Sequence, residues 1–350
     1  MAYEGRLLSE VEADIWDAFV AKHPFGRGMV ATASRQWWGT NGWSLHPIGA
    51  FEAGEMVAGA AVVCKKIPCT PWRLARIEAL MVNAEDMSGS AEILLAEAER
   101  LCRSLGCVEV EIRARIPENT PIDGRDLYTG VQEAVTERGY ARDAFRPATY
   151  LVPLQRDDEQ LLNSYSSKCR RDVRKGLREG VAVTELRADE DLAGFFGAQQ
   201  QMADRKGIES LSEATQKAAQ PMYAGGYLRL FAAQYKDLTC NMALVDALGM
   251  PRYMLGAATP AAFEKGVPPT GQPLHYEIMR RFRDRGARFY DLGGSPGPVP
   301  MEGHPNYTVW RFKHEFGAPY VYMLPYHRKS LSRLGGLALA LARKMRRLPP

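Results

Sequence analysis

The sequence predicts an α/β protein of mixed α+β character, built from two tandem modules with the same strand–strand–helix–strand order. Three observations lead to this prediction. Strand and helix patterns alternate along the chain, a helix–glycine–strand unit at 92–112 recurs at 272–292, and 350 residues exceed the ~100 to 200 of a usual domain. Because chance rarely preserves order, spacing and a closing glycine together, we interpret the offset of 180 residues as an internal duplication.

The elements of the first module follow from hydrophobic periodicity. Residues 55–63 form an apolar run typical of a buried strand, and residues 76–82 form a second one. Ser90 is suited to cap a helix whose apolar residues have helical spacing, and Gly106 is suited to end it. Residues 107–112 alternate apolar and polar side chains, which predicts a strand with one buried face.

The second module repeats this order. Residues 252–258 form a strand with a Gly-Ala-Ala segment like that of the first module. Residues 274–285 have the pattern of an amphipathic helix, and Gly286 is suited to close it. Residues 288–292 follow as a strand. The second module therefore repeats the strand, helix, glycine and strand that end the first.

Each half also ends in a similar apolar strand, at 148–154 in the first and 320–324 in the second. The polar run 155–159 interrupts the apolar pattern, which favours a domain boundary near 153–163. We therefore expect domain 1 at 1–155, completed by the C-terminal segment, domain 2 at 156–325, and a basic C-terminal helix at 326–350, running from Ser330 to Leu348.

Composition excludes several classes of protein. With 46% hydrophobic and 25% charged residues, wholesale disorder, collagen-like repeats and coiled-coil rods are not expected. The longest uncharged apolar run has nine residues, too few for a spanning helix, and the N-terminus lacks a secretory pattern, so we expect a cytoplasmic protein. The six cysteines include no CxxC pair, so we expect no metal site and interpret Cys64, Cys69, Cys102 and Cys107 as small core residues.

Basic residues gather in two places, although the net charge is only +4. From Arg311 onward, nine Lys and Arg residues face the single acid Glu315. Such clusters attract the phosphates of nucleic acids, nucleotides or lipids, and a solvated helix face is an equally weighted alternative. The C-terminal helix could pack on a domain or make a peripheral membrane contact. The second cluster contains Lys168, Arg170, Arg171, Arg174, Lys175 and Arg178.

Several short stretches, spread over both halves, carry a family resemblance. They are Thr32–Trp38, Ser167–Lys175 with Gly180-Val181, Met202–Gly207, Leu274–Glu277 with Arg285-Gly286, Tyr290–Gly294 and Phe312–Gly317. In their order they resemble the Fem family of aminoacyl-tRNA-dependent peptidyl transferases, which build peptidoglycan cross-bridges, and its relatives that aminoacylate peptide natural products. The tandem modules resemble a duplicated GNAT-like acyltransferase fold. Thr32-Ala33 replaces a Gln-Ser pair of the family, and His275 stands where many relatives have Gln.

The resemblance implies a set of catalytic residues. It places Lys313 beside the reacting carbonyl, where a cation stabilises the developing oxyanion, and makes Phe312 a wall of the channel. Asp291 accepts the amine proton or orients the loop that follows it. The alternatives are a surface lysine on a strand and a structural carboxylate. A dinucleotide-binding GxGxxG sequence is not present.

The resemblance also implies how substrates bind. Arg35 and Arg205 would bind the diphosphate of a nucleotide-linked muropeptide or another peptide acceptor, and Trp37 or Trp38 would stack on it or pack in the core. We expect a monomer with no cofactor and with aminoacyl-tRNA as co-substrate. The remaining expected substrate residues are Tyr276, Gly293 and Gly294, and the expected tRNA residues are Lys168, Arg170, Arg171, Arg174 and Lys175.

Two other functions stay open. A CoA-dependent N-acyltransferase of the same superfamily needs an Arg/Gln-x-x-Gly-x-Gly/Ala loop leading into a helix, and Arg103–Cys107 only half matches this pattern and precedes a strand. A non-catalytic protein that binds RNA or a precursor would not need the intact Phe312-Lys313 pair. The sequence therefore favours the tRNA-dependent transferase.

Overall fold

The fold was analysed in a computed structural model that describes residues 3–122, 124–294, 302–304, 307–337 and 339. The chain divides into two compact units. Unit 1 comprises residues 1–26, 30–147 and 322–350, and unit 2 comprises residues 27–29 and 148–321. The main boundary between the units, at 147/148, lies earlier than the boundary expected at 155/156. The reason is that the strand at 148–153 pairs within unit 2.

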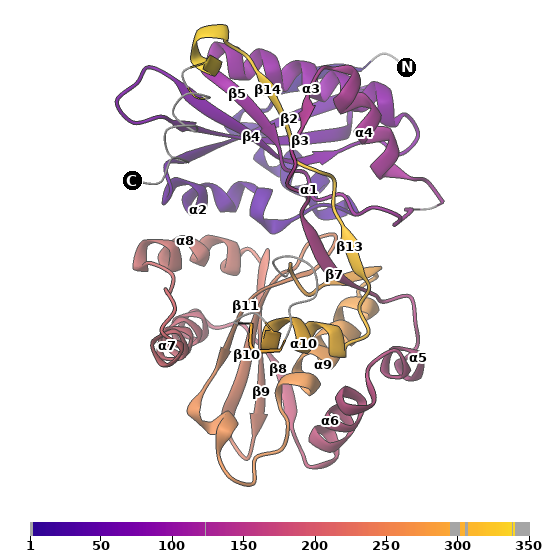
Figure 1. Ribbon diagram of the computed structural model, residues 1–350, viewed down its shortest axis with the longest axis vertical. Coiled ribbons are helices and arrows are strands. Elements are labelled where there is room, and N and C mark those ends of the chain that lie inside the picture. Colours follow the sequence, from indigo (N-terminus) through magenta and orange to yellow (C-terminus); the bar gives the residue numbers. More distant parts are fainter. Residues whose placement is uncertain (1–2, 123, 295–301, 305–306, 338, 340–350) are drawn as a thin grey trace. The chain divides into compact units, whose positions relative to one another are not determined.

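Unit 1 contains a seven-stranded sheet in the order β1-β2-β3-β4-β5-β14-β6 (Figure 1). Strands β3 and β4 are antiparallel, whereas β4 and β5 are parallel because helix α3 connects them. Its elements are β1 (Glu4–Leu7), α1 (Ala13–Lys22), α2 (Arg35–Gly39), β2 (Trp43–Glu52), β3 (Glu55–Lys66), β4 (Arg73–Met81), α3 (Met87–Ser104), β5 (Cys107–Ile112), α4 (Leu127–Glu137), β6 (Ala141–Arg142) and β14 (His327–Ser330).

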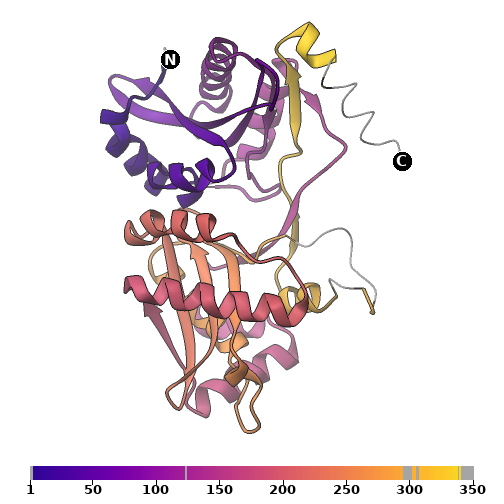
Figure 2. The same cartoon turned by 90° about the vertical axis from the view of Figure 1, so that its left-hand side faces the viewer.

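Unit 2 contains a second seven-stranded sheet, in the order β13-β7-β12-β11-β10-β9-β8. Helices α7 and α8 lie on one face of it, and α9 with α6 lies on the other (Figure 2). Its elements are β7 (Ala148–Pro153), α5 (Asp158–Asn163), α6 (Ser167–Arg178), β8 (Ala182–Leu186), α7 (Asp189–Lys206), α8 (Glu213–Ala224), β9 (Leu228–Tyr235), β10 (Leu238–Asp246), β11 (Arg252–Ala258), α9 (Gly271–Asp284), β12 (Phe289–Asp291), α10 (Tyr307–Glu315) and β13 (Tyr320–Tyr322).

The two copies of the helix–glycine–strand unit have the same backbone conformation at the glycine. Helix α3 and helix α9 each end shortly before a glycine with positive φ, +73° at Gly106 and +88° at Gly286. Only glycine adopts this left-handed conformation without strain, so the turn into β5 and β12 requires it. The N-terminus of α3 differs from expectation. Asp86 caps it through Gly89 N at 3.0 Å, and Ser90 lies inside the first turn, where its hydroxyl donates to Asp86 O at 2.6 Å.

The two units exchange one strand each. Strand β7 was expected to close the first half, but it pairs with β12 in unit 2. Strand β14 follows unit 2 in the chain, yet it pairs with β5 and β6 in unit 1. The expected start of the C-terminal helix is therefore wrong, since residues 327–330 are a strand. A helix begins at 333, and most of the expected helix lies outside the described residues.

The core of unit 2 packs its sheet against α6 and α9. Phe231, Phe282, Tyr290 and Phe316 lie in one cluster of buried side chains. Helix α6 approaches the start of α9 closely at Gly176, where a Cβ atom would lie 2.5 Å from Pro269 O. Within the described part of the chain, no helix combines the length and the apolar character that crossing a bilayer requires.

The strand exchange predicts that β14 is essential to unit 1. A chain ending at Tyr326 should lose β14, expose the edge of β5 and aggregate or melt at lower temperature, because an uncovered strand edge pairs with other chains. A chain ending at Leu337 keeps β14 and is the matched control. Thermal unfolding and size-exclusion chromatography of both would check this, and equal behaviour of the two chains would contradict it.

Candidate active site

A cavity of about 540 Å³ opens in unit 2 where two parallel strands separate. Strands β11 and β12 share a single paired position, Arg252 with Asp291, and the residues of β11 beyond it line the cavity. Helices α7, α9 and α10 supply the other walls. The wall is mostly apolar, with Met202, Ile208, Met242, Met254, Leu255, Leu274, Val309 and Phe312, and its polar members include Gln199, Lys206, Glu209, Asn241, Thr308, His275 and Lys313.

Lys313 is the buried cation of this cavity. It lies on α10, is only 7% exposed, and lines the cavity together with Phe312. Its ammonium donates hydrogen bonds to Gly293 O at 3.1 Å and Gly294 O at 2.6 Å. Among the described residues these two carbonyls are its hydrogen-bond partners, so one of the three N–H donors of the ammonium is left over there. The alternative of a surface lysine on a strand is wrong, because Lys313 is helical and buried.

The electrostatic environment keeps Lys313 charged near neutral pH but weakens its hold on the proton. Burial, together with the charge of Arg252, lowers the pKa of Lys313 from 10.5 to about 8. The carboxylate of Asp291 acts in the opposite direction. With a pKa of about 8, roughly 90% of the Lys313 side chains are protonated at pH 7. The cavity therefore holds a poorly solvated positive charge.

Asp291 fixes the loop that binds Lys313. Its side chain is fully buried, and its Oδ1 accepts hydrogen bonds from Gly293 N at 2.7 Å and from the hydroxyl of Thr149. Its Oδ2 lies 3.7 Å from Arg252 Nε. Gly293 has a φ of +81°, a conformation that suits glycine. Asp291 does not line the cavity, and this geometry favours the loop-orienting role over proton transfer.

His275 lines the same cavity as a neutral ring. Burial, and then the charge of Lys313, lowers the pKa of His275 to about 3. Aromatic rings enclose it edge-to-face, at centroid distances of 4.6 Å for Tyr253 and 5.3 Å for Phe312. An imidazole in this state is a weak base and carries no charge at neutral pH. It completes an aromatic wall beside the ammonium of Lys313.

The other expected substrate residues of unit 2 lie in different places relative to the cavity. Tyr276 lies in the hydrophobic core, 4% exposed, and not in the cavity wall, so its expected place is wrong. Gly293 and Gly294 bind the ammonium of Lys313 through their carbonyls and do not line the cavity. Arg205 lies on α7 beside the cavity and donates to Ala258 O at 2.5 Å.

The remaining acceptor residues belong to unit 1. Arg35, Trp37 and Trp38 all lie on α2, and both tryptophans are half-buried. The guanidinium of Arg35 is 3.5 Å from Glu10 Oε1. These three residues therefore share one short helix of the first unit, whereas Lys313 and Phe312 belong to the second.

Helix α6 presents a basic groove of about 430 Å³ on unit 2. Its buried face, with Cys169, Val173 and Gly176, points to the core. Three of the expected tRNA residues have structural partners: Lys168 and Arg171 pair with Asp172 at 3.1 Å and 3.9 Å, and Arg170 donates to Tyr165 O at 2.8 Å. The groove is lined by Ser167, Arg170, Arg171, Arg174, Lys175 and Arg178.

Sequence reasoning missed most of the cavity wall. Met202, Met242 and Met254 come from α7, β10 and β11, and nothing in their local sequence separates them from core methionines. The alternation of β11 indicates two faces but not that the strand parts from β12. That separation depends on the partner strand, so no local pattern encodes it.

The buried charge of Lys313 predicts a pH-dependent stability difference between the protein and Lys313→Met. The pKa of Lys313 is about 8 in the folded chain and near 10.5 when unfolded, so the unfolded chain binds more protons between these values. The stability of the protein relative to Lys313→Met should therefore rise by roughly 2 kcal/mol between pH 7 and pH 10. Urea unfolding of both proteins at the two pH values measures it, and a constant difference would contradict it.

The chain is similar over most of its length to proteins of known activity. No family model matches the sequence. The lipid II:glycine glycyltransferase of Staphylococcus aureus (strain bovine RF122 / ET3-1) is 22% identical over 373 residues, covering 86% of this chain and 87% of the relative. A relative of the same name from Staphylococcus haemolyticus (strain JCSC1435) is also 22% identical, over 371 residues.

Solved structures agree with this relationship. The crystal structure of FemX matches with a TM-score of 0.79 at 18% identity, covering 93% of this chain and 97% of that chain. A tandem GNAT protein from the clavulanic acid biosynthesis pathway matches with a TM-score of 0.50 at 14% identity, covering 95% and 99%. These likenesses confirm the predicted tandem GNAT-like fold. The similarity to the curated relatives and to the FemX structure supports the resemblance of this chain to the Fem family.

Proposed function

We propose that the protein is an aminoacyltransferase that moves an amino acid from aminoacyl-tRNA to an amine of a peptide acceptor and so forms a peptide bond. The observation that carries this proposal is the buried ammonium of Lys313 at the wall of the cavity in unit 2. Similarity to curated relatives that are glycyltransferases supports the transfer chemistry. We place the reaction in the cytoplasm, where charged tRNA is available.

The reaction is the aminolysis of an ester. The acceptor amine attacks the ester carbonyl, a C–N bond forms, and negative charge develops on the carbonyl oxygen. The remaining N–H of Lys313 would stabilise this oxyanion, and removing one such donor typically costs ~2.7 to 4 kcal/mol of barrier. The intermediate then expels the ribose hydroxyl of the tRNA, and Phe312 walls the channel in which this occurs.

The proton of the attacking amine must reach the leaving ribose oxygen. Among the described residues that line the cavity, His275 is too weak a base to take it, with a pKa of about 3. The carboxylate of Asp291 is occupied with Gly293, Thr149 and Arg252. We assign the proton transfer to the substrate, whose neighbouring ribose hydroxyl can relay the proton to the leaving oxygen. Asp291 acts by holding the loop that binds Lys313.

The acceptor is proposed to be a peptidoglycan precursor, since lipid II is named for the curated relatives. A nucleotide-linked muropeptide or a peptide of a natural product has the same reactive amine. Arg205 stands beside the cavity and Arg35 lies on α2 of unit 1, and forked guanidinium donors suit the diphosphate of such a precursor. We assign the acceptor-binding role of unit 1 to Arg35, Trp37 and Trp38.

The first turn of α9 argues against the use of acyl-CoA. In that reaction, free backbone amides at a helix N-terminus bind the pyrophosphate of CoA. Helix α9 begins Gly271-Gln272-Pro273, and proline has no amide hydrogen. Leu274 N already donates to Thr270 O at 3.1 Å. The proline therefore removes one of the amides that this turn could offer to a pyrophosphate, which favours tRNA as the donor.

A transfer assay tests the proposal. The protein is mixed with tRNA charged with labelled amino acids and with muropeptide acceptors, and the expected product is RNase-sensitive. We expect Lys313→Ala to lower turnover ~100-fold or more, because the oxyanion loses its buried donor. Lys217→Ala, at an exposed lysine of α8, is the control and should retain turnover. A product formed from acyl-CoA without tRNA, or full activity of Lys313→Ala, would refute the proposal.

The basic groove of α6 is proposed to contact tRNA phosphates through Arg174 and Arg178, which are exposed. If each contacts one phosphate, Arg174→Gln with Arg178→Gln should weaken tRNA binding and reduce the slope of log affinity against log salt by about 1.4 to 1.8. Arg100→Gln with Lys217→Gln removes the same charge from other helices. Filter binding over a salt series measures both, and equal slopes for the two double variants would refute the assignment.

A further inference from the structure

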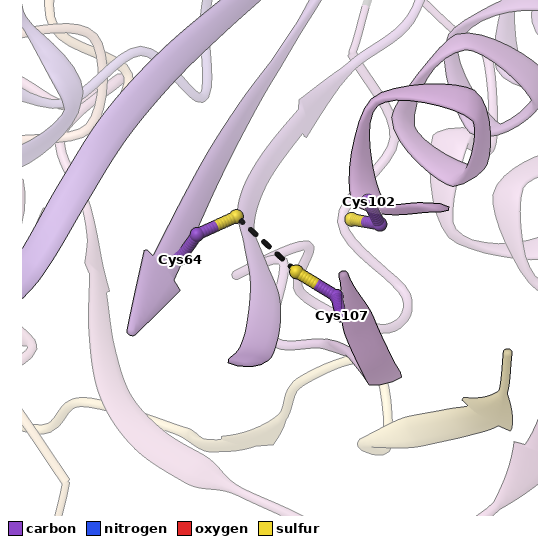
Figure 3. A group of neighbouring side chains, drawn as sticks. All are labelled: Cys64, Cys102 and Cys107. Atoms are coloured by element: carbon purple, nitrogen blue, oxygen red, sulfur yellow. Dashed lines mark hydrogen bonds between the residues drawn. The ribbon is translucent and has the colours of Figure 1, made fainter. Parts of the chain in front are cut away.

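Three cysteines from three separate elements of unit 1 lie side by side in its core (Figure 3). Cys64 is on β3, Cys102 is on α3, and Cys107 is the first residue of β5. Their exposed fractions are 1%, 0% and 4%. All three sulfur atoms lie within 4.8 Å of one another, and the Sγ atoms of Cys64 and Cys107 are 3.8 Å apart.

These spacings suit metal thiolates. Zinc binds cysteine sulfur at about 2.3 Å in tetrahedral geometry, which places neighbouring sulfur atoms about 3.8 Å apart. The separation of Cys64 and Cys107 equals that value, and an inward shift of Cys102 by less than about 1 Å would complete the triangle. A disulfide would need the sulfur atoms at about 2.05 Å. The cluster is therefore nearer to a three-sulfur ligand set than to a bonded pair.

We propose that Cys64, Cys102 and Cys107 bind one zinc ion that joins β3, α3 and β5 of unit 1. Binding releases the three thiol protons and transfers no electrons. Zinc with three thiolates carries a net charge of about −1, which needs a cation or a polar neighbour when buried. The positive charge of Arg73 acts on Cys64 and Cys107, and His46 is a further ionisable neighbour of Cys107.

The duplication offers an internal comparison. With the offset of 180 residues, Cys102 and Cys107 correspond to Phe282 and Ala287 in unit 2. Phe282 is a buried member of the apolar core there, and Ala287 packs against the same cluster. Unit 2 thus fills this corner with an aromatic ring, whereas unit 1 fills it with three sulfur atoms. The site is independent of the cavity and of the proposed transfer reaction.

Metal analysis of the full-length protein tests the proposal. We expect about one zinc ion per chain after purification and dialysis, and less than about 0.2 in Cys102→Ser, which removes one of three ligands. Cys240→Ser changes another buried cysteine outside the cluster and should keep the zinc. Because Cys102→Ser could fail to fold, the unmodified protein is also exchanged with Co²⁺. A thiolate-to-cobalt charge-transfer band is then expected.

Three results would overturn the proposal. The first is the absence of both bound zinc and the cobalt band. The second is an equal zinc content in Cys102→Ser and the unmodified protein. The third is a metal-free protein in which two of the six cysteines form a disulfide. Thiol titration after denaturation without reductant detects the last result. Supporting results are metal at one ion per chain and a chelator-induced loss of melting temperature that Cys102→Ser no longer shows.

Discussion

The site in unit 2 depends on the bonding of one buried ammonium. Lys313 loses most of its hydration, and the carbonyls of Gly293 and Gly294 replace part of it. Those carbonyls are in place because Asp291 accepts from Gly293 N, and Asp291 is in place because β12 pairs with β7 and β11. A charge held in this way has few groups to reorganise, which in the proposed reaction would stabilise the oxyanion electrostatically.

The two units share a strand order but differ in how far the two central parallel strands pair. In unit 1, β4 and β5 pair over five positions, from Arg73 to Ile77 on β4, and the corner beside them contains sulfur. In unit 2, β11 and β12 pair at one position, and the cavity opens beyond it. A duplicated fold can therefore keep a closed sheet in one copy and open a substrate cavity in the other, because strand separation affects few hydrogen bonds. Function lies in such local differences and not in the fold as a whole.

Local sequence patterns could predict much of this fold. The strands at 107–112 and 252–258 have the predicted bounds, since alternation and apolar runs are local signals. The family resemblance identified Lys313 and Phe312, and both line the cavity. The C-terminal segment was expected to complete the first domain, but partner choice between distant strands is not local, so the strand β14 and the pairing of β7 in unit 2 were missed. The same holds for Tyr276, whose helix face points to the core, and for cysteines separated by 38 residues that meet only in three dimensions.

The exchange of strands also sets an order of events during synthesis. The edge of β5 stays open after residue 112 emerges, because its neighbour β14 begins only at residue 327. At ~5 to 20 residues per second, that interval lasts roughly ten to forty seconds on the ribosome. Unit 2 can complete its own sheet during this time, since β7 to β13 all precede β14. The first half of the gene therefore encodes the half of the protein that finishes folding last.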